Sequence, residues 1–141
     1  MPAIYQHVHI VRDDEIDAQG HVGNVEYLKW MQAAAIEHST AQGWPPERYH
    51  QVGAGWVVRS HTIHYLQPAL AGQQILVLTW VSDFRKTRSL RKYKIVRPAD
   101  GSVLAQAATD WAYIGMQHRV PRRIPRELAD AFPLVPEAEE P

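Results

Sequence analysis

The sequence predicts an α+β fold in which one long buried helix is wrapped by a curved antiparallel sheet of about five strands. Three observations lead to this class. One strand pattern comes first, a single long helical pattern follows it, and the second half of the chain holds four stretches rich in Val, Ile, Thr, Tyr and Trp. Several strands in succession after one helix are typical of an α+β arrangement rather than of alternating β-α units. The 141 residues suffice for one domain with its own core.

The first half of the chain divides into a strand, a loop and a helix. Residues 5–11 alternate as a half-buried strand does, whereas residues 12–23 are polar and contain glycine, which indicates a loop. A helix is predicted from Asn24, a good N-cap residue, to the neighbourhood of Gly43, where glycine ends it. Apolar residues recur at steps of three and four and also fill neighbouring positions, so this helix is expected to be buried on most sides.

The second half is predicted to form long antiparallel strands. The strand patterns cover residues 56–66, 74–84, 89–96 and 102–114, and each is separated from the next by a turn signal, the strongest being Asp100-Gly101. Three successive hairpins would make a meander, and long antiparallel strands coil, so the sheet is expected to curve. Ala105 and Ala107 supply small side chains on one face of the last strand, where a helix can lie close.

The predicted domain covers residues 1–132, and the acidic, proline-rich residues 133–141 are expected to fray. One such sheet leaves an edge strand open. Because pairing with a second copy would cover that edge, the sequence predicts a homodimer.

Composition excludes several classes of protein. Fifteen Lys and Arg balance fifteen Asp and Glu, whereas dedicated nucleic-acid binders are usually basic. The absence of cysteine excludes disulfides, thiolate catalysis and Cys-based metal sites, and the eight histidines lack the paired spacing of a helical zinc site, so no metal or other cofactor is predicted. No apolar run has signal-peptide length or reaches about 18 residues, so we expect no membrane partner and a cytoplasmic protein.

The zero net charge hides two basic runs. Residues 85–97 hold seven of the fifteen Lys and Arg side chains and no acid, and residues 119–126 hold four arginines. From composition alone two interpretations stay open. The cations form a solvated face on alternating strand positions, or they make a local site for a small molecule that carries phosphate.

Asp17 is the candidate catalytic residue. It lies seven residues before Asn24, across a glycine-containing loop that can fold back on the predicted start of the helix. Unpaired N–H groups at a helix start can hold a developing oxyanion, and a carboxylate beside them would face the carbon of a bound acyl group. The alternative is that Asp17 only caps the loop or the helix.

This region resembles a known family. Its motif on the loop and early helix is similar to the signature of the hotdog-fold acyl-CoA thioesterases of the 4-hydroxybenzoyl-CoA thioesterase class; it consists of Asp17, Gly20, His21, Val22, Asn24, Tyr27 and Leu28. Segments further along the chain match the same family in order: 63–69 with Gly72, 93–95 with 100–101, and 122–125. The resemblance covers most of the chain. It implies a hotdog fold, cleavage of acyl-CoA to free acid and CoA, and dimers or tetramers with active sites at the subunit interface.

The resemblance also assigns roles by position. Asp17 matches the nucleophile or general base, and Asn24 matches the position whose backbone N–H polarises the carbonyl. Pocket-shaping positions are matched by His21, Gly23 and Tyr27. Three departures from the family pattern leave the aspartate and the helix start in place: Gly23 instead of Asn, Gln32 instead of Glu, and Glu15-Ile16 instead of Asp-Thr.

The same resemblance suggests a ligand for the two basic runs. Coenzyme A carries a 3′-phosphate and a pyrophosphate, which call for Arg and Lys at the mouth of the pocket. The candidates are Lys86, Arg88, Arg91, Arg122 and Arg123. The five tryptophans are expected mainly in core and interface packing, so they indicate no acyl preference.

Three further functions stay open beside an acyl-CoA hydrolase. A hotdog module that binds acyl-CoA without turnover would keep the basic runs, but the presence of Asp17 argues against it. A dehydratase or hydratase would need a catalytic histidine with an acid partner in its own loop motif, which the sequence lacks. A thioesterase for acyl carrier protein would use the same chemistry, and the basic runs could equally face that acidic protein.

Overall fold

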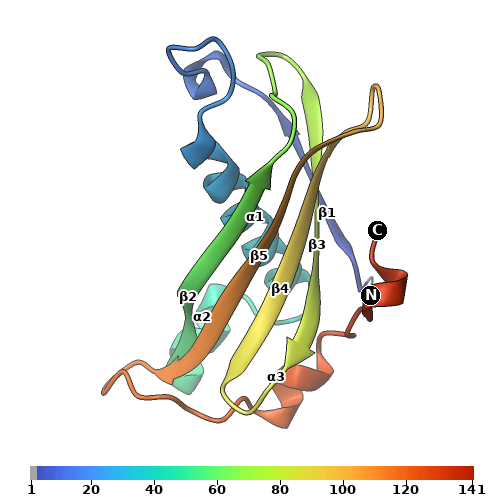
Figure 1. Ribbon diagram of the computed structural model, residues 1–141. Helices are drawn as coiled ribbons and strands as arrows, with labels where there is room; N and C mark the ends of the chain where they lie inside the picture. Colours follow the sequence, from blue (N-terminus) through green and yellow to red (C-terminus); the bar gives the residue numbers. More distant parts are fainter. Residues whose placement is uncertain (1–2) are drawn as a thin grey trace.

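The computed structural model describes residues 3–141 and contains one antiparallel sheet of five strands with a long helix against it (Figure 1). The α+β class and the strand number predicted from the sequence are confirmed. The elements in chain order are β1 (Tyr5–Ile10), η1 (Asp13–Glu15), α1 (Asn24–Ala41), α2 (Pro46–Val52), β2 (Ala54–Tyr65), β3 (Gln74–Phe84), β4 (Arg88–Arg97), β5 (Ser102–Gly115), α3 (Arg126–Asp130) and η2 (Glu137–Glu139).

The predicted meander is wrong at its first hairpin. The strand order is β1-β3-β4-β5-β2, so β2 pairs with β5 and not with its sequence neighbour β3. The edge of β3 is taken instead by β1, from Tyr5↔Thr79 to Ile10↔Gln74. Because β1 also contacts α1, docking of the helix brings β1 to this edge and leaves the opposite edge of the sheet to β2.

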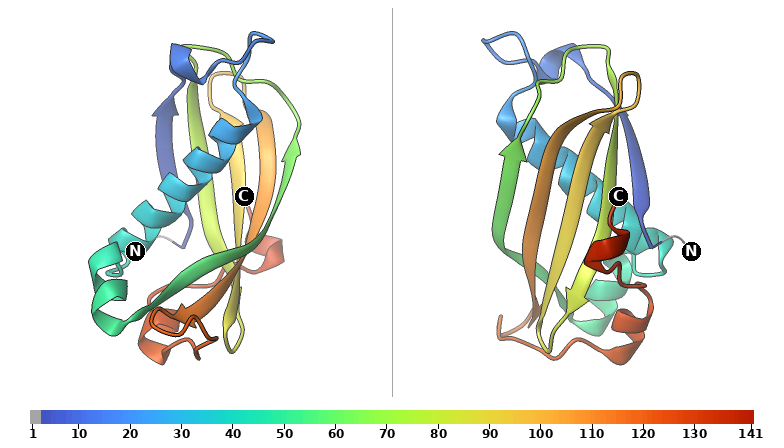
Figure 2. Two further views of the ribbon diagram at one scale, coloured as in Figure 1. Left: turned by 90° about the vertical axis from the view of Figure 1, so that its left-hand side faces the viewer. Right: turned by 45° about the vertical axis from the view of Figure 1, so that its right-hand side comes forward.

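Helix α1 lies across the concave face of the curved sheet (Figure 2). Its buried side chains Trp30, Met31 and Ala34 belong to one core cluster with inward-facing residues of the sheet: Ile75, Val77, Tyr93, Ile95, Leu104 and Ala105. Ala105 is completely buried, which agrees with the predicted close approach of helix and sheet. Each large apolar side chain buried in this way contributes about 1.5–3 kcal/mol to stability.

A second cluster fills the lower end of the molecule, where α1 ends. It contains Trp44, Ala54, Val81, Tyr113, Ile124, Leu128 and Phe132. The chain continues past Phe132 along β3 and β4. The Val135 amide donates to the Val81 carbonyl at 3.1 Å, and Lys92 Nζ lies 2.7 Å from Glu140 Oε2. The segment expected to fray therefore has defined contacts with the sheet.

No helix within residues 3–141 is long and apolar enough to cross a membrane.

Candidate active site

The loop between β1 and α1 is closed by its own backbone. The Asp17 amide donates to the His21 carbonyl at 2.8 Å, and the Gly20 amide donates to the Asp17 carbonyl at 3.0 Å. Gly20 adopts φ +87°, a conformation that glycine reaches without strain. A bridge between Ile16 and Val22 closes the base of the loop. The turn is therefore fixed next to the start of α1.

The Asp17 carboxylate projects from this turn and is 37% exposed. The Gln19 amide donates to its Oδ1 at 2.8 Å. His21 Nδ1 lies 4.0 Å from its Oδ2 and is exposed to the same degree. The carboxylate is thus held on one oxygen, while the other faces a histidine at the surface.

Helix α1 begins without a side-chain cap. The predicted N-cap, Asn24, is the first helical residue, and Gly23 takes the cap position at φ −65°. The Gly23 amide donates to the Glu15 carbonyl, and the Glu26 amide to the Gly23 carbonyl, each at 3.0 Å. The amides of Asn24 and Val25 are therefore the ones that helix geometry leaves without an intrahelical acceptor.

Asp17 lies beside this open helix start. A Cβ atom built on Gly23 would lie 3.7 Å from the Cβ of Asp17. The proximity of residue 17 to the first turn, expected from the short loop, is what the structure shows. A methyl group at position 23 would make an ordinary contact with Asp17, and a longer side chain would extend into the space beside that residue.

Glu15 is the residue that sequence reasoning missed. Its carboxylate is buried and accepts hydrogen bonds from the Arg12 amide (2.8 Å) and from Trp30 Nε1 (2.7 Å), and it lies 2.7 Å from His9 Nε2. Burial raises the pKa of Glu15, but these hydrogen bonds outweigh burial and leave the pKa below its usual value. The Glu15 carboxylate therefore links the loop to β1 and α1. Nothing in the sequence distinguished Glu15 from the exposed acids beside it, Asp13 and Asp14.

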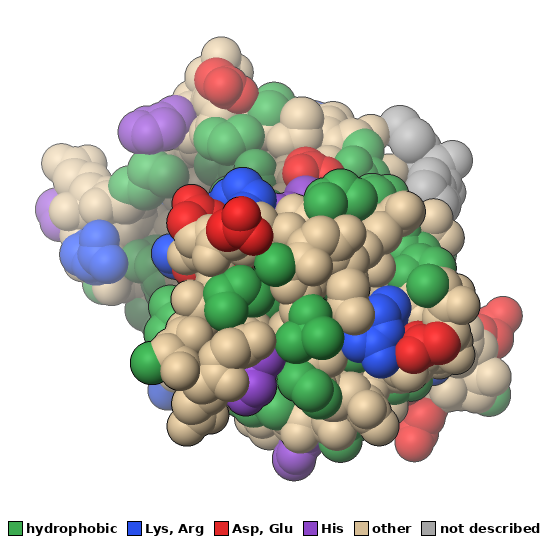
Figure 3. Space-filling model, turned by 90° about the horizontal axis from the view of Figure 1, so that it is seen from above, with side chains coloured by type: hydrophobic (Ala, Val, Ile, Leu, Met, Phe, Trp, Pro, Cys, Tyr) green, Lys and Arg blue, Asp and Glu red, His purple; other side chains and the backbone are tan. Residues whose placement is uncertain are grey.

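Tyr27, predicted to shape the pocket, points into the core. It is buried, its ring lies 4.9 Å from that of Trp30 and 5.1 Å from that of Tyr65, and burial raises its pKa. The Tyr65 hydroxyl donates to the Asn24 carbonyl at 3.1 Å, which fixes the start of α1 to the end of β2. Viewed from above, this end of the molecule carries acidic, basic and histidine side chains without one sign dominating (Figure 3).

The predicted cations are distributed over the opposite end. Lys86 and Arg123 line one surface hollow together with Arg85. Arg122 Nη1 lies 3.5 Å from the carbonyl of Gly53, the residue that caps the end of α2 and directly precedes β2. Arg88 forms an ion pair with Asp110 of β5. Figure 1 shows the β3–β4 turn and the loop after β5 at the far end of the sheet from the loop that holds Asp17.

The expectation that Arg91 lies on the surface is wrong. It is only 7% exposed, and its Nη1 lies 2.9 Å from His38 Nδ1 and donates to Thr79 Oγ1 at 3.1 Å. Arg91 shares the inward face of β4 with Ser89, Tyr93 and Ile95, because alternate residues of a strand point to the same face. Because successive side chains of a strand point to opposite faces, the position of Arg91 in β4 directs its guanidinium into the interior although it is charged.

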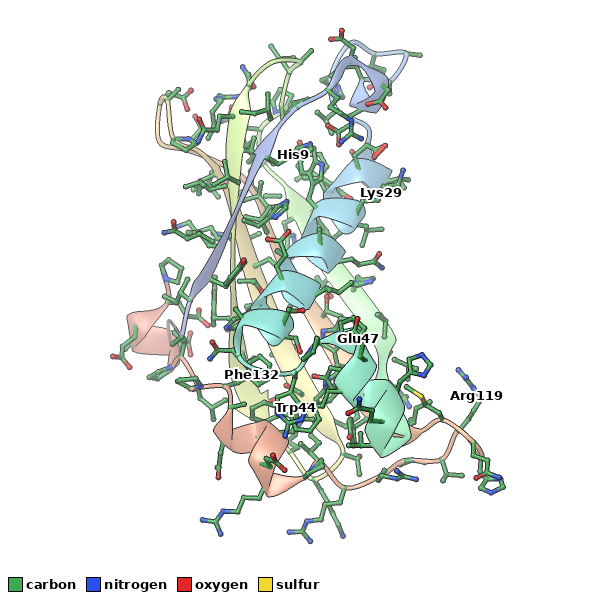
Figure 4. The ribbon with its side chains drawn as sticks, turned by 180° about the vertical axis from the view of Figure 1, so that it is seen from behind. His9, Lys29, Trp44, Glu47, Arg119 and Phe132 are labelled. Carbon is green, nitrogen blue, oxygen red and sulfur yellow. The ribbon has the colours of Figure 1, made fainter. Side chains whose placement is uncertain are left out.

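A cavity of about 570 Å³ lies between the second half of α1, α2 and the sheet. Aromatic side chains from several elements form most of its wall: Trp44, Tyr49, Trp56, Phe84, Trp111 and Phe132. Figure 4 labels Trp44 and Phe132, two of these residues, below the end of α1. Three of the five tryptophans therefore line this cavity as well as packing against their neighbours. Among residues 3–141 no three His, Asp or Glu side chains are grouped as metal ligands.

Comparison with solved structures gives close matches in fold. A 1,4-dihydroxy-2-naphthoyl-CoA thioesterase from Synechocystis superposes with a TM-score of 0.84 at 19% identity, over 92% of this chain and 95% of that one. A DHNA-CoA thioesterase from Staphylococcus aureus gives 0.82 at 21% identity, over 90% and 85%. A hypothetical protein from Staphylococcus aureus, solved in complex with CoA, gives 0.85 at 14% identity, over 91% and 80%.

The sequence itself matches a family model over residues 11–132, which includes the loop with Asp17, the helix, all strands after β1 and the second cluster. The matched family is described as the thioesterase-like superfamily, and the solved thioesterases share the hotdog arrangement of one helix against a curved antiparallel sheet found here. The chain therefore belongs to the thioesterase-like superfamily.

Proposed function

We propose that this protein hydrolyses acyl-CoA thioesters, with Asp17 as the catalytic carboxylate. The observation that carries the proposal is the 3.7 Å between the Asp17 Cβ and the Cβ position of Gly23, at a helix start that no side chain caps. A thioester carbonyl placed there would direct its oxygen to the amides of Asn24 and Val25 and its carbon to the Asp17 carboxylate. Such donors stabilise the oxyanion that forms when the carbonyl is attacked.

Two chemical routes to hydrolysis are open to this arrangement. In the first, an Asp17 oxygen attacks the carbonyl carbon, the C–S bond breaks, CoA leaves as thiolate, and water then cleaves the mixed anhydride. In the second, Asp17 takes a proton from a water molecule and the hydroxide attacks the carbonyl carbon. The C–S bond then breaks, CoA leaves as thiolate, and Asp17 releases the proton it had taken. A thiolate leaves readily, so neither route needs a strong general acid, which fits a site whose nearest histidine is 4.0 Å away at the surface.

We further propose that the working form is a two-fold dimer paired through β2. This edge strand has twelve residues with no proline, no lysine and no acid, and its one arginine, Arg59, lies at a register shift between Val58 and Ser60. The rest of the strand carries none of the residues that usually block pairing at an exposed edge. The Tyr65 end of β2 contacts the start of α1, while the Ala54 end lies near Arg122. Antiparallel pairing of two copies brings the Asp17 loop of one protomer toward the cations of the other, which a single chain keeps apart.

Lys86, Arg122 and Arg123 are the cations we propose for the CoA phosphates. All three lie at the end of the sheet that the dimer would present to the partner's Asp17 loop. The CoA complex of the structural neighbour supports this class of ligand. An acyl carrier protein is the second candidate donor, because its acidic surface would meet the same cations.

The test of the proposal is the Asp17→Asn variant in a thiol-release assay with CoA thioesters. Losing the carboxylate is expected to lower kcat by about 100- to 10,000-fold, the usual contribution of such a group. Asp13→Asn, an exposed acid of the same loop, is the matched control and should keep full activity. An unchanged kcat in Asp17→Asn, with the fold intact by circular dichroism, would refute the assignment. Running both thioester forms of one acyl group separates CoA from carrier protein.

A further inference from the structure

The aromatic cavity has one charged group in its wall. Apart from Arg91, the cavity is lined mainly by apolar and aromatic side chains, among them Trp56, Phe84 and Phe132. The Arg91 guanidinium carbon lies 5.9 Å from the centre of the Phe132 ring. A nearly buried cation in an apolar cavity is a local polar group of the kind that fixes the orientation of a ligand.

No carboxylate neutralises this cation within residues 3–141. Both hydrogen-bond partners of Arg91, His38 and Thr79, are contacted through Nη1, and neither is an acid. Three other cations of β4 do have acidic partners. Arg88 pairs with Asp110, Lys92 with Glu140, and Arg97 with Asp100. Burial lowers the pKa of Arg91, which reflects the cost of keeping this charge away from water.

An unneutralised guanidinium favours an anion. Burying a charge is costly unless it is paired, so a ligand that brings a negative oxygen to Arg91 offsets a cost that the empty protein carries. A planar guanidinium also suits a planar oxygen anion because it offers parallel N–H donors. An uncharged ligand would leave the buried charge of Arg91 without an anionic partner.

We propose that the cavity binds an apolar body that ends in an anionic oxygen, and that Arg91 selects this end. The inference rests on the proposed function: the occupant is the acyl group of the thioester, and the anion lies at the end remote from sulfur. A carboxylate and a phenolate share this chemistry. In the β2-paired dimer the cavity, at the Ala54 end of β2, lies toward the Asp17 loop of the partner, so the thioester of a bound acyl group can reach that loop.

Direct binding tests the proposal without any turnover. The probes are 4-phenylbutyrate and its neutral amide, 4-phenylbutyramide, titrated against the fluorescence of the tryptophans in the cavity wall. The wild-type protein is expected to bind the acid about tenfold or more tightly than the amide, the usual effect of one hydrogen bond to a charged group. Equal affinity for both probes, or no binding of either, would overturn the proposal.

Three variants make the result specific. Arg91→Met should bind both probes equally, and Arg91→Lys should keep part of the preference for the acid. Lys94→Met removes a cation from the same strand on the opposite face and should keep the wild-type preference. If Arg91→Met does not fold, the comparison of the two probes on the wild type and on Arg91→Lys still decides. A preference that survives in Arg91→Met would refute the role of Arg91.

The Asp17→Asn variant separates this proposal from the proposed function. It should bind 4-phenylbutyrate as the wild type does, because Asp17 is not part of the cavity wall. A phenolate arm uses 4-propylphenol and 4-propylanisole as the probes at a pH above the phenol pKa. If the carboxylate is preferred and the phenolate is not, the selected anion is a carboxylate.

Discussion

The two ends of this molecule are built by different means. At the Asp17 end the important groups are backbone amides and a partly exposed carboxylate, held in place by a short loop and by buried Glu15. At the opposite end aromatic side chains from distant parts of the sequence surround a cavity and a buried guanidinium. The first end is suited to polarise a carbonyl, and the second is suited to hold an apolar group.

This contrast explains why a single chain looks incomplete. The carboxylate is at one end of β2, and the cavity and cations are at the other, with the length of the strand between them. Two copies paired antiparallel through β2 would bring unlike ends together. The predictions below test whether the two ends are independent, starting with the largest expected effect.

The largest effect is expected at the cavity end. Phe132→Ala removes a buried ring that packs against Phe84, His38 and the Arg91 guanidinium. Truncation of a buried aromatic residue costs about 3–5 kcal/mol, and the enlarged cavity should also weaken probe binding. Urea unfolding measures the loss. If the two ends are independent, the residual folded protein keeps its kcat toward a short thioester, and a joint loss would contradict that independence.

A smaller loss of stability is expected at the Asp17 end. Glu15→Gln keeps the size of the side chain but removes one of two acceptor oxygens that face the Arg12 amide, Trp30 and His9. A buried donor is then left without a charged acceptor, which costs about 2 kcal/mol. Asp14→Asn, at the exposed neighbouring position, is the control and should leave the unfolding curve in place. Equal stability of Glu15→Gln and the wild type would show that the carboxylate does not anchor the loop.

The same residue predicts a dependence on pH. The folded-state pKa of Glu15 is lowered, so its stabilising contribution is complete above the pKa of the unfolded chain, about 4.3. It is lost as the pH falls from there through the lower folded-state pKa. The free energy of unfolding of the wild type should therefore decline more steeply below about pH 4.5 than that of Glu15→Gln. Parallel declines would contradict the lowered pKa.

The cations predict an effect on binding and not on chemistry. Replacing Lys86 and Arg123 together by Glu places two negative charges in the hollow that they share. The KM for a CoA thioester should rise about tenfold or more, and the KM for a short thioester without the nucleotide should not change. Arg126→Glu, in the same basic run but outside the hollow, is the control. Equal effects on both substrates would exclude a role in binding the CoA phosphates.

The smallest effect on stability is expected for Gly23→Ala. Gly23 has φ −65°, which any residue adopts, and a methyl group there meets Asp17 at 3.7 Å, an ordinary contact. Stability should change by less than about 1 kcal/mol, as is usual for an N-cap glycine. A larger side chain, as in Gly23→Leu, must displace the Asp17 carboxylate, so kcat should fall while Tm stays close to that of the wild type. An unchanged kcat in Gly23→Leu would show that the space between residue 23 and Asp17 is not needed for catalysis.

Sequence patterns were sufficient where a feature is local. The strand and helix limits follow from period and turn signals, and β3 begins and ends at the predicted residues. The approach of Asp17 to the helix start also follows from the sequence, because a short loop that contains Gly20 leaves the chain little freedom. The N-cap differs by one residue, since a loop that hydrogen-bonds Gly23 to Glu15 makes Gly23 the last residue outside the helix.

Arg91 shows how a local signal was overlooked. Ser89, Tyr93 and Ile95 share its face by simple alternation, and that face is inward. The assumption that every arginine lies on the surface took no account of this alternation of buried and outward-facing residues along β4. The sequence alone could have placed Arg91 on the inward face. It could not have shown that no acid of residues 3–141 pairs with Arg91, because that depends on every element packed around it.

The sequence by itself determined the α+β class, the single long helix, the strand segments and the loop that brings Asp17 to the start of α1, since each depends on residues close together in the chain. Only the tertiary structure decided that β1 takes the edge of β3 and that β2 pairs with β5. It also decided that aromatic residues from α2, the sheet, the loop after α1 and the C-terminal segment line one cavity with Arg91 in its wall. These features arise from contacts between distant segments, whose free energies depend on how the helix docks on the sheet and are not encoded in any local period.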